Sequence, residues 1–354
     1  MDRAFPATPP EVSVIVPARN EEACLGDCLQ SLVAQTGVAF EIIVVDDGST
    51  DRTREIAESV AGVRVISPGP LPERWTGKNN AVVAGANEAR GEWLLFTDAD
   101  TVHLPGSLAR ALMEAKREGA ELLSYSPEQV VATFSEKAVM PVVFAELAAQ
   151  YPPGKVRDES SGVVAANGQY ILVRRKAYDA VGRHTAVASE ILEDVALARR
   201  FKNAGRHISF RYGGDAVRTR MYRNWNELRE GWTKNLALLF PRPLRRAALL
   251  FAWWAIAWLT LPLLIPAIAL YWRMRRAHFG LASTMLAVVF GPPVFAYLLL
   301  RSERAHARSI IPWKGRRYGR DPRRAEPLTP KEAIRGGRVS ASLERRPDTN
   351  LAGN

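Results

Sequence analysis

Strand-like and helix-like segments alternate through the first 125 residues of the chain. Apolar, mostly β-branched runs that predict strands lie at Val12–Val16, Phe40–Val45, Val63–Ile66 and Trp93–Phe96. Between them, apolar residues at helical spacing predict helices over residues 21–34, 52–61 and 78–89. Strands joined by helices of about ten residues form right-handed βαβ units. The pattern therefore predicts an α/β fold with a mostly parallel, Rossmann-like sheet.

Acidic residues follow two of these strands at the point where each strand ends. Asp46 and Asp47 follow the second strand, and Asp98, Ala99 and Asp100 follow the fourth. Ligands of open α/β sheets bind at the carboxyl ends of the strands. Two hard oxygen donors there suit Mg²⁺ or Mn²⁺ carrying a diphosphate. Because many Asp-x-Asp pairs are solvated loop residues, the metal site gains its support from the recurrence of acids at one edge.

The residues after the first strand belong to the same predicted edge. We expect a nucleotide to contact this edge, where an aspartate can accept hydrogen bonds from a base or a ribose. The segment between residues 46 and 49 also fits a simple turn, because Gly48 follows Asp47. The residues that we assign to the nucleotide from the first two strand ends are Pro17, Ala18, Arg19, Glu21, Asp46 and Asp47.

A glycine and a lysine begin the helix that precedes the fourth strand. In the segment Trp75-Thr76-Gly77-Lys78-Asn79, the helix start can direct backbone N–H groups and Lys78 toward a phosphate. A surface loop whose tryptophan covers the core explains the same residues equally well. Both interpretations stay open on the sequence, and we assign Lys78 to the diphosphate.

Beyond residue 123 the alternation is less regular. Val163–Val173 predicts a strand interrupted by a turn or bulge at Asn167-Gly168. Residues 189–203 predict a helix with Ser189 as its cap and acids in its first turns. On this pattern alone, Glu193 and Asp194 are explained by helix capping and the helix dipole.

Two long uncharged segments follow residue 240. Residues 247–272 and 279–300 carry no charge and are long enough to cross a bilayer, with tryptophans at interface positions. Two full crossings would place the basic connector 273–278 outside the cell, against the positive-inside tendency. Pro262, Pro266 and Gly291-Pro292-Pro293 also permit kinked or re-entrant segments. We therefore expect integral or tight membrane association; a buried helical hairpin of a soluble protein is the alternative.

The two ends of the chain differ in charge. Residues 1–10 lack the apolar stretch of a signal peptide, so we expect the catalytic part to face the cytoplasm. Residues 301–354 carry 14 basic and 6 acidic residues, which is +8 of the chain's net +11. We expect this tail to contact anionic lipids rather than nucleic acid, and its last residues to be disordered. Cys24 and Cys28 predict a reduced packing role.

These features predict three parts. Residues 1–240 form a catalytic domain, with a nucleotide-binding half at about 10–125 and an acceptor half at about 126–240. Residues 244–300 form two hydrophobic membrane segments. Residues 301–354 form the basic, partly disordered tail.

Four motifs in order along residues 12–240 resemble the family-2 glycosyltransferases of GT-A fold. They are Val14-Ile15-Val16-Pro17-Ala18-Arg19-Asn20-Glu21-Glu22, Val44-Val45-Asp46-Asp47-Gly48-Ser49-Thr50-Asp51, Thr97-Asp98-Ala99-Asp100 and Leu192-Glu193-Asp194. The resemblance implies inverting transfer of a sugar from a nucleotide diphosphate sugar. It also implies that Asp46 and Asp47 contact base and ribose, that Asp98 and Asp100 bind ribose, diphosphate and metal, and that Asp194 is the general base. We place Asn167, Gly168, Glu193 and Trp232 on the acceptor side.

Three further stretches resemble a bacterial membrane subgroup associated with hopanoid and carotenoid pathways. They are Trp75-Thr76-Gly77-Lys78-Asn79, Trp232-Thr233-Lys234-Asn235 and Trp313-Lys314-Gly315-Arg316. This likeness implies a lipid-like acceptor. Residues 227–232 lack the Gln-x-x-Arg-Trp motif typical of processive synthases, so a single transfer is expected. UDP is the favoured carrier, with UDP-glucose, UDP-GlcNAc and GDP-mannose left open, and no protein partner is indicated.

Two other functions compete with this one. A sugar-nucleotide pyrophosphorylase would show a glycine-rich phosphate loop with a basic residue after the first strand, and residues 17–21 contain no glycine. A non-catalytic membrane scaffold with a degenerate transferase domain would not be expected to keep acids at every expected position.

Overall fold

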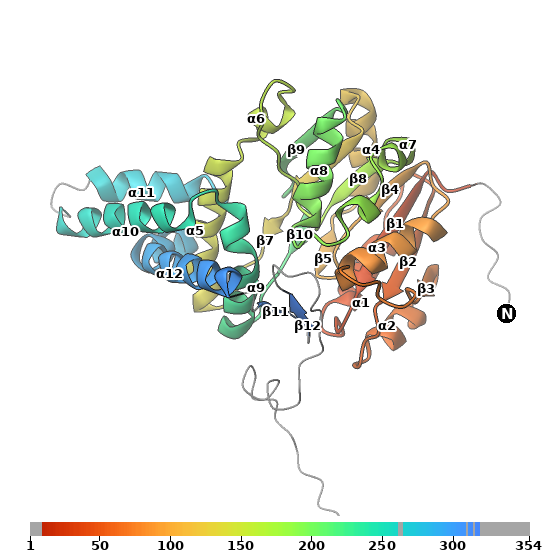
Figure 1. Ribbon diagram of the computed structural model, residues 1–354, viewed down its shortest axis with the longest axis horizontal. Coiled ribbons are helices and arrows are strands. Elements are labelled where there is room, and N and C mark those ends of the chain that lie inside the picture. Colours follow the sequence, from red (N-terminus) through yellow and green to blue (C-terminus); the bar gives the residue numbers. More distant parts are fainter. Residues whose placement is uncertain (1–8, 261–264, 309–310, 314–315, 319–354) are drawn as a thin grey trace, which may run out of the picture.

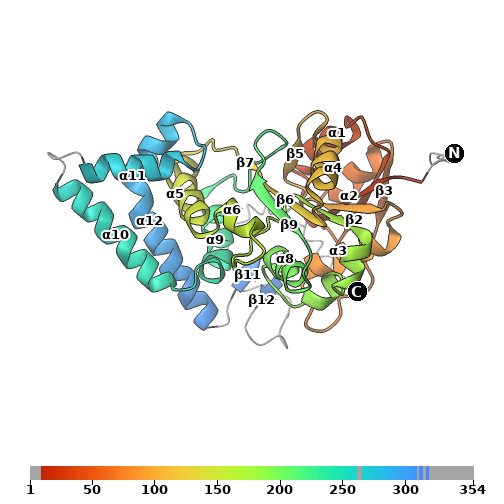
Figure 2. The same cartoon turned by 90° about the horizontal axis from the view of Figure 1, so that it is seen from above.

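The computed structural model describes residues 9–260, 265–308, 311–313 and 316–318. A seven-stranded sheet forms one side of the molecule, and a group of long helices forms the other (Figures 1 and 2). The sheet order is β3-β2-β1-β4-β8-β6-β9. Its strands, in that order, are Val63–Ile66, Phe40–Asp46, Val12–Ala18, Trp93–Phe96, Ile171–Arg174, Leu122–Ser126 and Ile208–Tyr212.

The sheet is mostly parallel, as the alternation of strands and helices predicts. β1 pairs in parallel with β2 and β4, β2 with β3, and β6 with β9. β8 alone runs antiparallel to its neighbours β4 and β6. A second, three-stranded sheet joins β5 (Thr101–His103), β10 (Val217–Thr219) and β7 (Glu128–Gln129). A short hairpin pairs β11 (Ile311–Trp313) with β12 (Arg316–Tyr318).

Alternate side chains of the strands enter two separate cores, one on each face of the large sheet. Val14 and Val44 face α1 (Leu25–Val33), α2 (Thr53–Ser59) and α4 (Ser107–Glu118), whereas Ile15 and Ile43 face the opposite helices. The helices of that opposite face are α3 (Gly77–Glu88), α7 (Arg175–Ala180) and α8 (Glu193–Asn203). Cys28 is a free thiol buried in the first core, in agreement with a packing role.

Two predicted elements in the second half begin later than expected. The residues from 163 to 166 are not in a strand, and β8 begins only at Ile171. α8 begins at Glu193 with Leu192 as its N-cap residue, so the prediction of Ser189 as the cap was wrong. Residues 184–187 form a 3₁₀ turn, and the Asn79 side chain at the start of α3 donates to the carbonyl groups of Val187 and Ala188.

The third core joins the catalytic half to the C-terminal helices. α5 (Phe134–Gln150) and α9 (Trp225–Leu239) pack there against α10 (Pro243–Leu259), α11 (Ile265–Arg275) and α12 (Leu281–Ala307). Gly291 allows α12 to lie close to α5, because an added Cβ would lie 2.2 Å from Val142 Cγ2 and 2.7 Å from the carbonyl oxygen of Ala138. The α12 helix continues through Pro292 and Pro293.

The hydrophobic C-terminal segments differ from the prediction in one respect. Residues 247–272 are not one helix, because α10 ends at Leu259 and α11 starts at Ile265. Within the described residues, α12 is the one helix long and apolar enough to cross a membrane, and half of its most apolar window is buried in the protein. α12 also extends to Ala307, so the predicted tail begins inside a helix. The predicted disorder of the last residues lies outside the described part of the chain.

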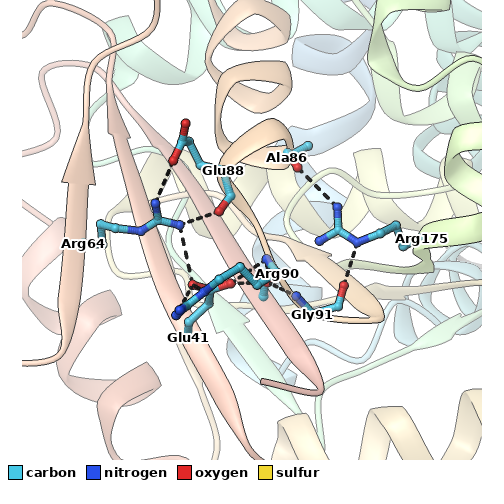
Figure 3. A network of polar contacts seen from close by, with 8 residues as sticks. Glu41, Arg64, Ala86, Glu88, Arg90, Gly91 and Arg175 are labelled. Atoms are coloured by element: carbon cyan, nitrogen blue, oxygen red, sulfur yellow. Dashed lines mark hydrogen bonds and ion pairs between the residues drawn. The ribbon is translucent and has the colours of Figure 1, made fainter. Parts of the chain in front are cut away.

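A buried glutamate organises the edge of the sheet where the strands begin (Figure 3). The Glu41 carboxylate on β2 accepts hydrogen bonds from Ser13 Oγ at 2.7 Å and from the Arg90 backbone N–H at 2.7 Å. The Arg90 guanidinium binds it at 3.0 Å, and that of Arg64 lies at 3.5 Å. Next to it, Arg175 donates to the carbonyl groups of Gly91 and Ala86. These contacts hold β1, β2 and the turn before β4 in register, far from the carboxyl ends.

Candidate active site

The carboxyl ends of β1, β2 and β4 bring the predicted motifs together. Ala18 of β1 lies beside Asp46 of β2 in the parallel register, and the Asp47 N–H donates to the Ala18 carbonyl at 2.9 Å. On the other side of β1, the Thr97 N–H donates to Ile15 at 3.2 Å, which carries the chain from β4 toward Asp98. The parallel sheet therefore places all three acidic strand ends at one edge.

A cavity of about 530 Å³ opens at this edge. All but one of the predicted site residues line it. The residues that line it are Pro17, Ala18, Arg19, Glu21, Asp47, Lys78, Asp98, Ala99, Asp100, Asn167, Gly168, Glu193, Asp194 and Trp232.

Asp46 is the predicted residue that does not line the cavity. Its side chain is buried at the end of β2, where it accepts the Ser49 N–H at 3.1 Å and lies 3.8 Å from an Arg54 nitrogen. Asp46 thus shapes the loop that presents Asp47. Gly48 takes a positive φ of 68° in that loop, which a glycine adopts without strain.

Lys78 links two acidic groups that lie far apart in sequence. Its Nζ lies 2.7 Å from Asp98 Oδ1 and 2.8 Å from Glu193 Oε1. Burial opposes the charge, but the two carboxylates outweigh it and raise the pKa of Lys78 above its ordinary value. The Thr76 side chain caps α3 by accepting the Asn79 N–H at 3.1 Å, so the helix start and Lys78 are fixed together. This geometry favours the phosphate-side interpretation over a surface loop.

Glu193 and Asp194 begin α8 but point into the cavity rather than merely capping the helix. The Gly168 N–H donates to Asp194 Oδ2 at 2.9 Å, and the Val195 N–H donates to Oδ1 at 2.8 Å. Burial, followed by the negative charge of Glu193, raises the pKa of Asp194 to about 6. For Glu193 burial acts the same way, but the Lys78 ammonium outweighs it and lowers the pKa. One acid is thus held ionised and its neighbour is poised near neutrality.

Gly168 lies where these groups meet. A Cβ at this position would lie 3.0 Å from Lys78 Nζ, 3.5 Å from Glu193 Oε1 and 3.6 Å from Asp194 Oδ2. Glycine therefore allows this backbone to lie close to the lysine and the two carboxylates, where a side chain would be crowded. The interrupted segment around Asn167-Gly168 was predicted from the sequence, but its contact with Asp194 was not.

The donor set at Asp98 and Asp100 fits a divalent metal that arrives with a diphosphate. Among the residues that the structure describes, no group of three or more His, Cys, Asp or Glu side chains could hold a metal by itself. Mg²⁺ commonly binds one or two carboxylates and completes its shell with phosphate oxygens and water. The turn that carries both acids is fixed by Thr101, whose hydroxyl donates to the Asp98 carbonyl at 2.7 Å.

The side of the cavity that the helices form carries many apolar side chains beside a few polar ones. Its walls come from α5, α9 and the connector between α11 and α12, with Phe144, Leu147, Leu239 and Phe279 among the lining residues. Trp232 is buried in this wall and makes edge-to-face contacts with Phe144 and Tyr222 at centroid distances of 6.1 Å and 5.9 Å. The cavity is therefore lined both by the acidic strand ends and by a largely apolar helical wall.

Several cavity residues were missed by the sequence analysis. Lys234 lies two residues after Trp232 on α9, and burial lowers its pKa although Glu193 opposes the shift. Arg276 and His278 come from the α11–α12 connector, where the His278 ring stacks on Tyr212 at 4.0 Å. The motif that marked Trp232 also contains Lys234, so its signal was present. The connector was missed because two full crossings would have put it on the far side of a membrane.

Comparison with known proteins finds a match to one family model, and the similar relatives are named as glycosyltransferases. The model of the family Glycosyl transferase family 2 matches residues 13–182. A 4,4'-diaponeurosporenoate glycosyltransferase of Staphylococcus aureus strain MRSA252 is 27% identical over 341 residues, which is 87% of this chain and 88% of the relative. The protein of the same name from strain USA300 is 30% identical over 234 residues, which is 64% of this chain and 60% of the relative.

Solved structures with a similar arrangement are more distant. The mannosyltransferase of Pyrobaculum calidifontis, in complex with GDP-Man and Mn²⁺, is 17% identical with a TM-score of 0.48, covering 85% of this chain and 88% of that one. S. aureus TarS in complex with UDP-GlcNAc is 19% identical with a TM-score of 0.43, covering 65% of each chain.

Proposed function

We propose that the chain, whose residues 13–182 match the model of Glycosyl transferase family 2, transfers a single sugar from a nucleotide diphosphate sugar to a lipid-like acceptor, with inversion at the anomeric carbon. The observation that carries the proposal is that one cavity is lined both by the acidic strand ends and by a largely apolar wall from α5 and α9. The transferase domain has the α/β fold with a mostly parallel sheet expected from the sequence, followed by apolar C-terminal helices.

In this proposal the donor lies at the acidic end. Pro17, Ala18, Arg19, Glu21 and Asp47 contact the nucleoside, and Asp46 supports the Asp47 loop from behind. UDP is the favoured carrier, as the motifs that the sequence shares with the family imply.

Asp98 and Asp100 would hold the Mg²⁺ or Mn²⁺, and Lys78 would lie beside the diphosphate. A bound metal supplies Lewis-acid stabilisation of the charge that develops on the leaving diphosphate. Lys78 Nζ lies 2.7 Å from Asp98, so its ammonium is beside the carboxylates that would hold the metal and would add positive charge next to the diphosphate. Both contributions favour departure of the leaving group more than they favour the ground state.

Asp194 is the proposed general base. The acceptor oxygen attacks the anomeric carbon and gives its proton to the Asp194 carboxylate, while the bond from that carbon to the diphosphate oxygen breaks and the electron pair leaves with the diphosphate. The pKa of about 6 suits this role, because a base that titrates near the working pH is both ionised and basic enough. Glu193 remains ionised beside it and holds Lys78.

The acceptor would lie at the apolar end, along Trp232 and the walls from α5 and α9, with Asn167, Gly168 and Glu193 near its reactive group. The relatives named 4,4'-diaponeurosporenoate glycosyltransferase support an acceptor with a long apolar body. The apolar helix α12, which is long enough to cross a membrane, supports action at a membrane. As expected from the sequence, the catalytic part would face the cytoplasm. The domain limits expected from the sequence, at residues 240 and 300, remain part of this proposal.

A donor panel tests the reaction. Membranes containing the full chain are supplied with UDP-glucose, UDP-GlcNAc or GDP-mannose, with and without Mn²⁺. We expect one donor to release nucleoside diphosphate in a metal-dependent manner and to add one sugar mass to a lipid in the extract. Asp194→Asn should abolish both signals, whereas Glu190→Gln, an exposed acid four residues earlier, should leave them unchanged. Formation of nucleotide sugar from sugar phosphate would instead indicate a pyrophosphorylase, and inactivity with every donor would favour a scaffold.

A further inference from the structure

α10 and α11 form a helical hairpin whose chemistry changes from its base to its tip. No charged residue occurs between residues 247 and 272, and residues 261–264 lie outside the described part of the chain. We call the end of α10 at Leu259 and Thr260 and the start of α11 at Ile265 the tip of the hairpin. The base is basic on both helices, through Arg242, Arg245, Arg246, Arg273, Arg275 and Arg276. The hairpin projects away from the sheet (Figures 1 and 2).

At the base of the hairpin, both helices bind the same buried carboxylate of α5. Arg246 Nε donates to Glu146 Oε2 at 2.7 Å, and Arg273 Nε donates to Glu146 Oε1 at 2.6 Å. Glu146 lies on α5 and is only 3% exposed. The connector that follows α11 then lines the cavity through Arg276 and Phe279. The hairpin therefore leaves the catalytic body and returns to it on the same side.

The α12 helix also begins and ends against the catalytic body. It starts just after Phe279 in the cavity wall. Near its end, the Ser302 hydroxyl donates to the Thr233 carbonyl of α9 at 2.7 Å, and His306 Nε2 lies 2.8 Å from the Lys234 carbonyl oxygen. Because both of its ends contact the body that holds the cavity, α12 lies along that body.

The outer face of the hairpin is exposed and apolar. The exposed side chains include Leu249, Trp253, Ile256, Trp258 and Trp272. Exposure is greatest beside the tip, at 83% for Leu259 and 72% for Ile265. A surface of this kind on a monomer marks a site of interaction. The arginines at its base add positive charge where anionic lipid headgroups would lie.

We propose that the α10–α11 hairpin inserts tip first into one leaflet of an anionic bilayer and leaves it on the catalytic side. At 1.5 Å per residue, the helices rise about 20 Å from Arg246 to Leu259 and about 12 Å from Ile265 to Arg273. A full crossing of the hydrocarbon core requires about 30 Å. The hairpin reaches roughly the middle of the bilayer, with tryptophans along it and arginines at the headgroups.

Vesicle flotation of the full, detergent-purified chain tests the insertion. We expect the chain to float with vesicles of phosphatidylcholine and phosphatidylglycerol, and less with phosphatidylcholine alone. The double substitution Leu259→Glu/Ile265→Glu should abolish flotation, and Arg245→Glu should reduce it only with the anionic vesicles. Met113→Glu, at an exposed apolar side chain of α4 far from the hairpin, is the matched control and should float normally.

Unchanged flotation of the tip variant would overturn the proposal. If that variant had also lost a concentration-dependent dimer, the face would be assigned to a second copy of the chain.

Cysteine labelling in intact cells tests the one-sided topology. In a chain whose Cys24 and Cys28 are replaced by alanine, single cysteines are introduced by Thr260→Cys at the tip and Arg276→Cys in the connector. We expect neither to react with a membrane-impermeant maleimide from outside, and the connector cysteine to react once the membrane is opened. Labelling of either position from outside would refute one-leaflet insertion. Neither assay measures sugar transfer, so their outcome is independent of the proposed reaction.

Discussion

Among single residues, Asp194 is the one whose surroundings should have the most directly measurable effect on the reaction rate. Its carboxyl group is protonated below its raised pKa of about 6 and cannot then accept a proton. We predict that kcat/KM falls about tenfold per pH unit below pH 6 and reaches a plateau above pH 7. Glu193→Gln should move the midpoint downward, because the carboxylate that raises the pKa of Asp194 is removed. Initial rates from about pH 5 to 8 measure this, and an unchanged midpoint in the variant would refute the coupling.

Lys78 is the second residue with a defined consequence. Lys78→Ala removes the ammonium that pairs with Asp98 and Glu193, and under our proposal it also removes a cation from the leaving diphosphate. We predict a loss of about 10²-fold in kcat/KM, the usual cost of one group that stabilises developing charge. Lys176→Ala, at an exposed lysine of α7, serves as the control and should retain full activity. Equal rates for the two variants in steady-state assays would remove Lys78 from the site.

Among the elements, the start of β2 is expected to affect the stability of the fold and not the reaction, because it lies far from the carboxyl ends of the strands. Burial opposes the charge of Glu41, but hydrogen bonds from Ser13 and Arg90 outweigh it and lower its pKa. The stabilisation is therefore present above the ordinary pKa of a glutamate and is lost as the pH falls through the lowered value. We predict that Glu41→Gln lowers the free energy of unfolding by about 3 kcal/mol at neutral pH.

The control for this change is Glu92→Gln, since Glu92 is exposed and its 3.2 Å ion pair with Arg174 is on the surface. It should change stability by less than about 0.5 kcal/mol. Thermal unfolding of the two detergent-solubilised variants, with donor turnover per folded molecule, makes the comparison. Selective loss of turnover in the Glu41 variant, with normal stability, would contradict the structural role.

The elements also show how far the sequence could lead. The strand ends with Asp47, Asp98 and Asp100 could be predicted, because strand periodicity is local and parallel strands must end at one edge. The pairing of Lys78 with Glu193 could not, since it joins residues 115 positions apart that only the tertiary fold brings together. Hydropathy also could not distinguish two short helices of a hairpin from one helix that crosses the membrane, because both consist of the same apolar side chains.

For the molecule as a whole, the C-terminal helices belong to the wall of the cavity. Phe144 of α5 and Leu236 of α9 share one core with Phe295 of α12. We predict that a chain ending at residue 240 is insoluble or inactive, because removal of α10–α12 exposes that core and opens the cavity. The full-length tip variant, Leu259→Glu/Ile265→Glu, keeps the core and should still release nucleoside diphosphate. A soluble 1–240 fragment with full donor turnover would refute this dependence.

The connector between α11 and α12 has a consequence for substrate access. Only three residues, 276–278, lie between Arg275 at the end of α11 and Phe279 in the cavity wall. With the hairpin embedded in lipid, only this connector lies between the bilayer that dissolves the acceptor and the cavity in which the acceptor reacts. A water-insoluble acceptor would then have little aqueous distance to travel, and the length of this loop would govern its rate of entry.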